Sequence, residues 1–251
     1  MKFAIVTPCF QSEQFLLKTL QSVIGQAGNF SLHYHVQDAG STDGTLAFLQ
    51  SQATQIERGN TPIQCRKLTF SYASEPDQGM YDGINHGFRY LLQRVDADVM
   101  LWINSDDTLE PGSLANLAKY FSDHPEVNWL IGHTRHMDEN CGITVDIQPH
   151  HYRRKDLATG KHDGITLPYV TQEATAWRRK LWDKCGELNT RLLYAGDFEY
   201  WMRAASQGFK LHSVDMAVGN HRKHPGQLSA AGCYADEVRL SVMNKRKLNV
   251  K

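Results

Sequence analysis

Leu-Trp-Ile-Asn-Ser-Asp-Asp, residues 101–107, is an apolar run that ends abruptly in two adjacent carboxylates. We interpret the run as a buried strand that delivers Asp106 and Asp107 to the edge of a sheet. Neighbouring carboxylates repel each other unless a cation lies between them, and a divalent ion that carries a diphosphate is a natural candidate. The alternative is a turn that leads into a helix, since Thr108 and Pro111 follow.

Three further polar clusters upstream also follow apolar runs, at residues 3–6, 32–36 and 65–72. Each cluster is followed by apolar residues at helical spacing. Strand, polar turn and helix, three times over, predict a parallel α/β sheet. Ligands of such sheets bind beyond the carboxyl ends of the strands, so we expect all four polar clusters to meet at one edge.

Near residue 127 the pattern of strand, polar turn and helix gives way to short β-type runs. We predict a β-hairpin from 129–137 and 143–147, a loop over 150–168, helices within 173–207 and a strand over 209–218. The loop is basic and rich in Gly, His and Tyr, which suits a mobile segment at the mouth of a site. The predicted organisation is a first half at 1–107, a second half at 108–230 that shares the same core, and a C-terminal helix at 231–251.

The composition favours a soluble enzyme. The chain has 251 residues, 41% of them hydrophobic, which is enough for one sizeable core. Lys plus Arg and Asp plus Glu both number 27, so no global field recruits nucleic acid. There is neither an apolar run of membrane-spanning length nor a signal peptide, and we expect a cytoplasmic location. The five cysteines are scattered without Cys-x-x-Cys spacing, which indicates reduced thiols and not zinc ligands.

Taken together, six sequence elements resemble family 2 glycosyltransferases of the GT-A fold, which transfer sugars from nucleotide-sugar donors. The resemblance runs from Phe3 to about Ser229. The elements are Asp-Ala-Gly-Ser-Thr-Asp-Gly-Thr at 38–45, Glu-Pro-Asp-Gln-Gly-Met-Tyr-Asp at 75–82 with Asn85, Ser-Asp-Asp at 105–107, Trp-Arg-Arg at 177–179, Gly-Asp-Phe-Glu-Tyr-Trp at 196–201 and His-Pro-Gly-Gln-Leu-Ser at 224–229. The resemblance implies a Rossmann-like, mostly parallel sheet flanked by helices, with a fused smaller antiparallel sheet on the acceptor side. It also implies that the half at 1–107 binds the nucleotide sugar and that the half at 108–230 binds the acceptor.

For the metal, the resemblance implies Mn²⁺ or Mg²⁺ bound by Asp107 together with the oxygens of the diphosphate. Asp106 would meet the ribose hydroxyls or the water of the ion. Ser105 stands where the family often has a third acidic residue, so the ion would depend more on phosphate and water. His224 matches the family histidine that approaches the metal or the diphosphate.

For the nucleotide, the resemblance implies that Asp38 hydrogen-bonds the base, which weakly favours a uridine or thymidine donor over a guanosine donor. It places Thr7, Pro8 and Phe10 in the base pocket, although a core role for Phe10 stays open. A second polar set at a helix N-terminus would contact the donor, and for the two acids capping is an equal alternative. This set comprises Asp77, Asp82 and Asn85.

The family motif places the catalytic base at Asp197, which would take the proton of the acceptor hydroxyl and so invert the anomeric configuration. The alternative is that Asp197 is a helix N-cap. By the same resemblance, Arg178 and Arg179 would contact phosphate or acceptor, unless they lie on a helix surface.

We therefore predict a glycosyltransferase that builds a surface polysaccharide or a lipid-linked glycan. One alternative is a catalytically silent partner subunit that binds nucleotide sugars. The other is a sugar-phosphate nucleotidyltransferase, which would need a Gly-rich basic loop that residues 7–14 lack. The C-terminal helix carries basic residues beside Val238 and Val242 and is a candidate for peripheral membrane contact, with a solvated helix as the alternative.

Overall fold

The structure of the protein is a computed structural model that describes residues 1–227 and 233–248. Within these residues a nine-stranded sheet runs through the protein. The strand order is β3-β2-β1-β4-β8-β6-β9-β5, and β7 pairs with β6. The strands are β1 (Lys2–Cys9), β2 (Gly28–Asp38), β3 (Cys65–Ser74), β4 (Val99–Trp102), β5 (Thr108–Leu109), β6 (Trp129–Met137), β7 (Ile143–Ile147), β8 (Thr175–Arg178) and β9 (His212–Arg222). The helices are α1 (Leu16–Ile24), α2 (Thr45–Glu57), α3 (Met80–Leu92), α4 (Ser113–Asp123), α5 (Arg154–Ala158), η1 (Gln172–Ala174), α6 (Arg179–Cys185), α7 (Gly196–Ser206) and α8 (Tyr234–Leu248).

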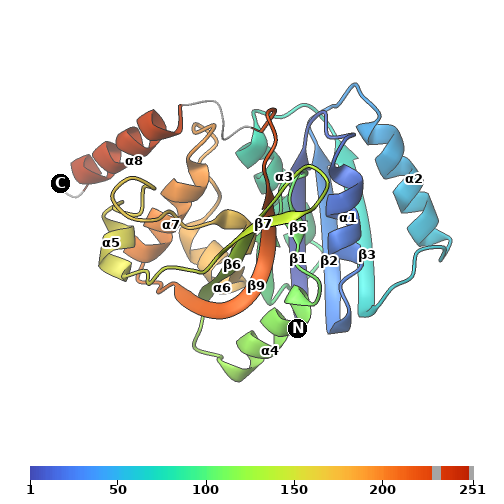
Figure 1. Cartoon of the computed structure of the whole chain (residues 1–251), viewed down its shortest axis with the longest axis horizontal. Helices are drawn as coiled ribbons and strands as arrows, with labels where there is room; N and C mark the ends of the chain where they lie inside the picture. Colours follow the sequence, from blue (N-terminus) through green and yellow to red (C-terminus); the bar gives the residue numbers. More distant parts are fainter. Residues whose placement is uncertain (228–232, 249–251) are drawn as a thin grey trace.

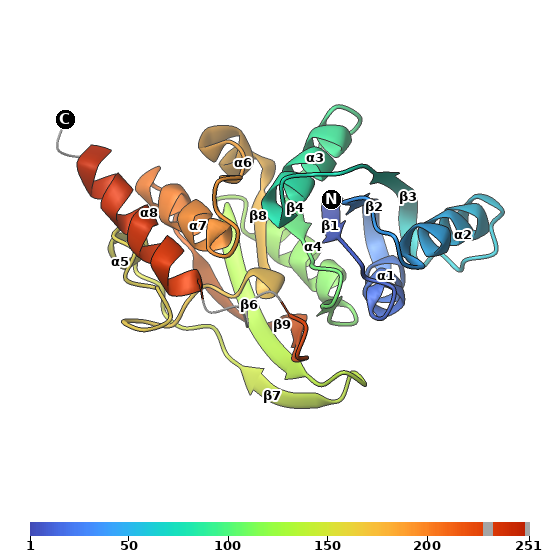
Figure 2. The same cartoon turned by 90° about the horizontal axis from the view of Figure 1, so that it is seen from above.

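The first four strands of the order form the parallel part of the sheet. Strand β1 pairs in parallel with β2 and β4, and β2 pairs in parallel with β3. Figure 2 shows α3 on one side of these strands, and α1 and α4 on the other. Strand β1 is buried from Phe3 to Cys9, as expected for a strand covered on both faces. The predicted parallel α/β sheet is confirmed.

The antiparallel pairs lie in the remainder of the sheet. Strand β8 pairs antiparallel with both β4 and β6, and the predicted hairpin of β6 and β7 has the predicted bounds. Strand β9 runs parallel to β6 and antiparallel to β5. These strands continue the parallel part through the β4–β8 pair (Figure 1), so the smaller antiparallel region is an extension of the same sheet. All strands from residues 1–107 lie on one side of that pair, and all later strands lie on the other.

Three predicted elements need correction. The segment 173–207, expected to be helical, contains the four-residue strand β8. Strand β9 starts later and ends later than the predicted strand over 209–218. The predicted loop over 150–168 contains the short helix α5. Strand β8 is stabilised by its two neighbours in the sheet, and four residues are too few to show a period.

A cluster of buried tryptophans joins α7 to the sheet. The ring of Trp201 in α7 stacks on Trp102 of β4 and Trp129 of β6, with centroids 5.7 and 5.2 Å apart. Trp177 of β8 meets Trp201 edge-on at 5.5 Å. Buried aromatic side chains contribute much of the packing free energy of a core. Asp197 lies one helical turn before Trp201 on the same face of α7, so this cluster fixes where the N-terminal turn of α7 points.

Candidate active site

The turn that carries the two adjacent carboxylates is held by helix α1. The hydroxyl of Thr19 donates to the carbonyls of Ser105 and Asp107, at 2.8 and 2.7 Å. The hydroxyls of Ser12 and Ser105 lie 2.8 Å apart. The turn following β4 is therefore fixed in position at the carboxyl edge of the parallel strands.

Asp107 directs its carboxylate into the protein. Its side chain is only 1% exposed. Oδ1 accepts from the backbone amide of Arg222 at 2.9 Å and lies 3.3 Å from Nδ1 of His221, while Oδ2 accepts from Asn104 at 3.4 Å. Asp107 thus joins the turn after β4 to the end of β9.

Arg222 is fully buried and completes that connection. Its Nε donates to the carbonyl of Asp106 at 2.7 Å, and Nη1 donates to the carbonyls of Asp138 and Glu139 at 3.1 and 3.0 Å. The guanidinium also lies over the ring of Phe15, 4.8 Å from its centroid. One side chain therefore ties the carboxylate turn to the hairpin of β6 and β7.

Asp106 and His224 form a pair on the accessible side of this turn. Oδ2 of Asp106 lies 3.0 Å from Nε2 of His224, and the two side chains are 27% and 13% exposed. Burial, together with the charge of Asp107, raises the pKa of Asp106. We expected His224 to share a metal with Asp107, whereas the structure brings it to Asp106.

Within residues 1–227 and 233–248 no three His, Cys, Asp or Glu side chains converge in a way that could hold an ion. Two protein donors still fit a divalent ion that takes its remaining ligands from a diphosphate and from water. The carboxylate of Asp106 is a donor that suits Mn²⁺ or Mg²⁺. The imidazole of His224 is a common metal ligand when it is neutral.

Glu173 is a buried carboxylate that the sequence analysis did not single out. It is 8% exposed and lies in η1, against β9, where a Cβ on Gly219 would collide with its carbonyl. Burial raises the pKa of Glu173 to about 7. Burial alone would lower the pKa of His221, but its hydrogen bond to Asp107 and the charges of Asp107 and Glu173 raise it to about 9. A single Glu at the start of a predicted helical segment gives no sign that its carboxylate is buried beside β9.

The predicted base-pocket residues differ in exposure. Phe10 is 60% exposed, so the alternative of a core role is wrong. Pro8 is buried, and the buried hydroxyl of Thr7 lies 3.0 Å from that of Tyr34. Of the three, Phe10 alone offers a ring face to a ligand.

Asp38 lies at the end of β2 and is fully buried. Oδ2 accepts from the backbone amide of Ser41 at 3.1 Å and from the hydroxyl of Ser74 at 2.6 Å, and Oδ1 accepts from the hydroxyl of Ser41. A carboxylate has about four acceptor positions, so most of the capacity of Asp38 is used within the protein. It ties the loop after β2 to the end of β3.

Gln11 adds a second tie to the same loop. It has a positive φ of 51°, and its side-chain oxygen accepts from the amides of Thr42 and Asp43 at 3.1 and 3.0 Å. Gln11 directly follows Phe10 after the first apolar run, which is the signal that could have identified it.

The second polar set divides into different roles. Asp82 lies in the first turn of α3 and accepts from the amide of Gln78 at 3.1 Å, while the N-cap of this helix is Gly79 and has no side-chain cap. Asp77 accepts from the amide of Gly79 at 2.9 Å, and burial raises its pKa. Asn85 is fully buried, and its amide exchanges two 3.0 Å hydrogen bonds with the backbone of Leu188. We therefore assign Asn85 a structural role in place of the expected contact with the nucleotide.

The two arginines of the Trp-Arg-Arg element are also used within the protein. Arg178 donates to the carbonyl of Phe121 in α4 and, at 2.8 Å, to the carbonyl of Val127 in the segment after α4. Arg179 pairs with Asp183 one turn later at 3.1 Å. This corrects the expectation that they contact phosphate or acceptor.

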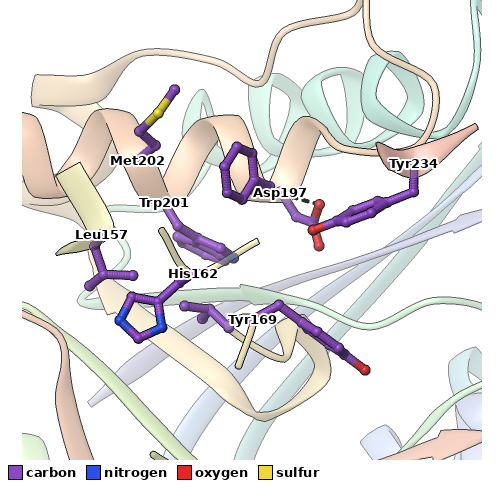
Figure 3. Close-up of a pocket in the computed structure, with 9 residues that line it drawn as sticks. Leu157, His162, Tyr169, Asp197, Trp201, Met202 and Tyr234 are labelled. Atoms are coloured by element: carbon purple, nitrogen blue, oxygen red, sulfur yellow. Dashed lines mark hydrogen bonds between the residues drawn. The ribbon is translucent and has the colours of Figure 1, made fainter. Parts of the chain in front are cut away.

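Asp197 lies in the first turn of α7, in a largely apolar pocket (Figure 3). The N-cap is Ala195 and makes no side-chain cap, so the N-cap alternative for Asp197 is wrong. Oδ1 accepts from the amide of Phe198 at 2.7 Å and lies 3.4 Å from the hydroxyl of Tyr81. The pocket is lined by Leu157, His162, Tyr169, Val170, Asp197, Phe198, Trp201, Met202 and Tyr234. Burial raises the pKa of Asp197 to about 6.

Helix α8 packs against α7. Val238 is 7% exposed and joins a small apolar cluster with Ala195, Phe198 and Met202, against which Val242 also packs. The valine face that we considered for membrane contact is therefore covered by α7, while Leu240 and Met243 are exposed. Lys251 and the side chains of the basic residues 245–247 lie outside the described residues, as do positions 228–232. In the described ranges no helix has both the length and the apolarity to cross a membrane.

Comparisons with known proteins agree with this geometry. The sequence profile described as glycosyl transferase family 2 matches residues 4–186. Hyaluronan synthase of Streptococcus pyogenes is 28% identical over 123 residues, which is 49% of this chain and 27% of that protein. An uncharacterized glycosyltransferase of Mycobacterium tuberculosis is 25% identical over 203 residues, covering 80% of this chain and 68% of the relative. The chain thus spans about a quarter of the length of the hyaluronan synthase that it matches.

Two solved structures show the same fold. S. aureus TarS, residues 1–349 in complex with UDP-GlcNAc, has a TM-score of 0.65 and 19% identity, covering 96% of this chain and 65% of that chain. The mannosyltransferase PcManGT from Pyrobaculum calidifontis, in complex with GDP-Man and Mn²⁺, has a TM-score of 0.63 and 16% identity, covering 98% and 63%.

Proposed function

The chain belongs to glycosyl transferase family 2 and is a glycosyltransferase of the GT-A fold, and we propose that it transfers a sugar from a nucleotide diphosphate donor to a glycan or lipid-linked acceptor. Its place would be polysaccharide or cell-surface glycan synthesis. One observation carries the proposal: the Asp106–His224 pair lies at the carboxyl edge of the sheet, and a separate carboxylate with a raised pKa, Asp197, opens α7. The nucleotide sugars in the titles of the two similar structures support a donor of this class.

Asp106 and His224 are the residues that we propose to hold Mn²⁺ or Mg²⁺. Such an ion, when bound, neutralises the charge that develops on the leaving diphosphate. Asp107 would not contact the ion and would act as a positioning residue, because its buried carboxylate fixes the amide of Arg222 and the ring of His221. A protonated His221, with its pKa of about 9, would add positive charge near the diphosphate.

The donor nucleotide would lie over the loops after β1 and β2. The exposed ring of Phe10 would stack on the base, beside Thr7 and Pro8. Asp38 would contact a uracil through its remaining acceptor capacity and would hold the loop that shapes the pocket. Asp77, with a partly buried carboxylate, completes the proposed donor contacts, with Asp82 beside it in the first turn of α3.

Asp197 would be the general base. The acceptor hydroxyl gives its proton to the carboxylate as its oxygen bonds to the anomeric carbon, and the bond between that carbon and the diphosphate oxygen breaks. A base with a pKa of about 6 is mostly ionised at neutral pH and still able to take a proton. A single displacement of this kind inverts the anomeric configuration.

A donor screen tests this function. The purified protein is incubated with uridine, thymidine and guanosine diphosphate sugars, with and without Mn²⁺, and followed by thermal shift and donor hydrolysis. We expect a Mn²⁺-dependent response to one nucleotide class, uridine first, and a β-linked product by NMR from an α-linked donor. No response to any nucleotide sugar would favour a silent subunit, and an α-linked product would exclude the single displacement.

A further inference from the structure

Glu237 of helix α8 binds the chain immediately before the proposed base. Its Oε1 accepts from the backbone amide of Leu193, and its Oε2 accepts from the amides of Tyr194 and Ala195, each at 2.8 Å. One carboxylate therefore binds three consecutive amides, 42 to 44 residues away in the sequence.

One of these contacts, to the amide of the N-cap residue Ala195, lies at the start of α7, and the other two lie just before it. Helix α7 has Ala195 as its N-cap and no side-chain cap of its own. Amides at a helix start lack partners within the helix, and an anion there also interacts favourably with the helix dipole. Hydrogen bonds to an ionised acceptor are about twice as strong as neutral ones. Glu237 thus fixes the backbone two residues before Asp197.

The rest of α8 forms part of the wall of the Asp197 pocket. Tyr234 lines this pocket, and Figure 3 shows its ring reaching toward the carboxylate of Asp197. Val238, one residue after Glu237, is buried against Ala195 and Phe198 on either side of Asp197. Helix α8 therefore contacts both the backbone before the base and the space beside it.

We propose that Glu237 is a positioning residue for Asp197, and that the docking of α8 on α7 completes the acceptor side of the active site. This inference rests on the proposed role of Asp197 as the base. Without Glu237, residues 193–195 lose their acceptor, and the first turn of α7 is free to shift relative to the donor edge. Misplacing a reacting group by ~1 Å costs about 10²-fold in rate.

The charge of Glu237 gives a second signature. The titratable groups that face Asp197 are Tyr81 from α3, Tyr169 and Glu173 from the segment before β8, and Tyr234 and Glu237 from α8. Glu237 contributes a negative charge that raises the pKa of Asp197. Removing this charge lowers that pKa, so the acid limb of the transfer rate moves to lower pH.

The test compares Glu237→Ala and Glu237→Gln with Asp236→Asn, a control at a neighbouring exposed position that pairs with Arg239. In Glu237→Ala we expect kcat to fall by about 10²-fold while the affinity for the nucleotide diphosphate, measured by calorimetry, stays within about twofold. In Glu237→Gln we expect a smaller fall in kcat and an acid limb at lower pH. Asp236→Asn should match the wild type.

Asp197→Asn, measured in the same assays, separates this inference from the proposed function. Near-normal transfer by Asp197→Asn would overturn the role of Asp197. An inactive Asp197→Asn together with a fully active Glu237→Ala would overturn the role of Glu237 alone. If Glu237→Ala does not fold, Glu237→Gln decides: a wild-type kcat and an unmoved acid limb contradict the proposal.

Discussion

The two sides of the site are built by different kinds of interaction. On the donor side, hydrogen bonds fix the groups that lie at strand ends: Thr19 of α1 holds the carboxylate turn, and Arg222 ties it to β9 and to the β6–β7 hairpin. On the base side, the position of Asp197 depends mainly on packing, through the stacking of Trp201 on the sheet and the docking of α8, to which the hydrogen bonds of Glu237 are added. The donor side therefore follows from sheet register, whereas the base side depends on how helices from the last third of the chain pack.

The electrostatics differ in the same way. The donor side places His221 beside Asp107, which raises the histidine pKa and provides positive charge. The base side surrounds Asp197 with apolar groups, which raise the carboxylate pKa. An enzyme that stabilises a leaving diphosphate and also takes a proton from the acceptor needs a positively charged group at one place and a carboxylate with a raised pKa at another.

Replacing the base should have the largest effect. We expect Asp197→Asn to reduce transfer by about 10²–10⁴-fold at saturating donor, the usual contribution of a general base. Glu199→Gln is a matched control on the same helix, since Glu199 pairs with Arg203. Steady-state transfer assays give the answer, and turnover of Asp197→Asn comparable to that of Glu199→Gln would move the base elsewhere.

On the donor side, replacing Asp106 and replacing Asp107 should have different effects, the first on activity and the second on stability. We expect Asp106→Asn, like His224→Ala, to reduce transfer by about 10²–10³-fold with the fold intact, since each removes a charge-stabilising group. Asp107→Asn should lower the free energy of unfolding by about 1–3 kcal/mol, because its buried partners lose an ionised acceptor. Transfer assays and urea unfolding measure the two effects. Full activity of wild-type protein dialysed against EDTA would remove the metal from this account.

In the nucleotide pocket we expect a smaller effect. Phe10→Ala should weaken nucleotide binding by about 1–3 kcal/mol, the usual value for base stacking, without loss of stability, because the ring is 60% exposed. Asp38→Ala should weaken binding by a similar amount, about 1–3 kcal/mol, and should also destabilise the fold, because its buried carboxylate ties the loop after β2 to the end of β3. Calorimetry paired with thermal unfolding distinguishes these patterns. Unchanged affinity in both variants would place the base pocket elsewhere.

The mildest effect is the pH dependence near neutrality. A raised carboxylate pKa means that Asp197 is protonated, and useless as a base, below about pH 6 and ionised above it. Transfer should therefore be nearly constant at pH 7–8 and fall about tenfold per unit well below pH 6. A rate profile at saturating donor reports this limb. An acid limb near pH 4, the ordinary carboxylate range, would mean that burial does not control the base.

The sequence predicted the elements whose residues carry a period or a turn signal. The parallel strands and the β6–β7 hairpin follow from apolar runs and from the polar break between residues 137 and 143. Strand β8 could not be predicted in this way, because it is stabilised by pairing with β4 and β6 and its four residues are too few to show a pattern.

For the proposed site, matching motifs predicted the roles of Asp106, His224 and Asp197 but gave no information on their pairings. That His224 meets Asp106, and that Asn85 turns to Leu188, depends on contacts 118 and 103 residues apart in the sequence. Glu173 and Glu237 carried no motif at all. Their importance comes from burial beside β9 and from three amides of the loop before α7, which only the folded chain brings together.

The most direct test of the separation between the two sides is calorimetric titration of uridine diphosphate, with and without Mn²⁺, into Asp106→Asn and Asp197→Asn. We predict that Asp197→Asn binds the nucleotide with the Mn²⁺ dependence of the wild type although it transfers no sugar, and that Asp106→Asn loses this dependence. Mn²⁺-dependent binding that survives in Asp106→Asn, or is lost in Asp197→Asn, would contradict the account.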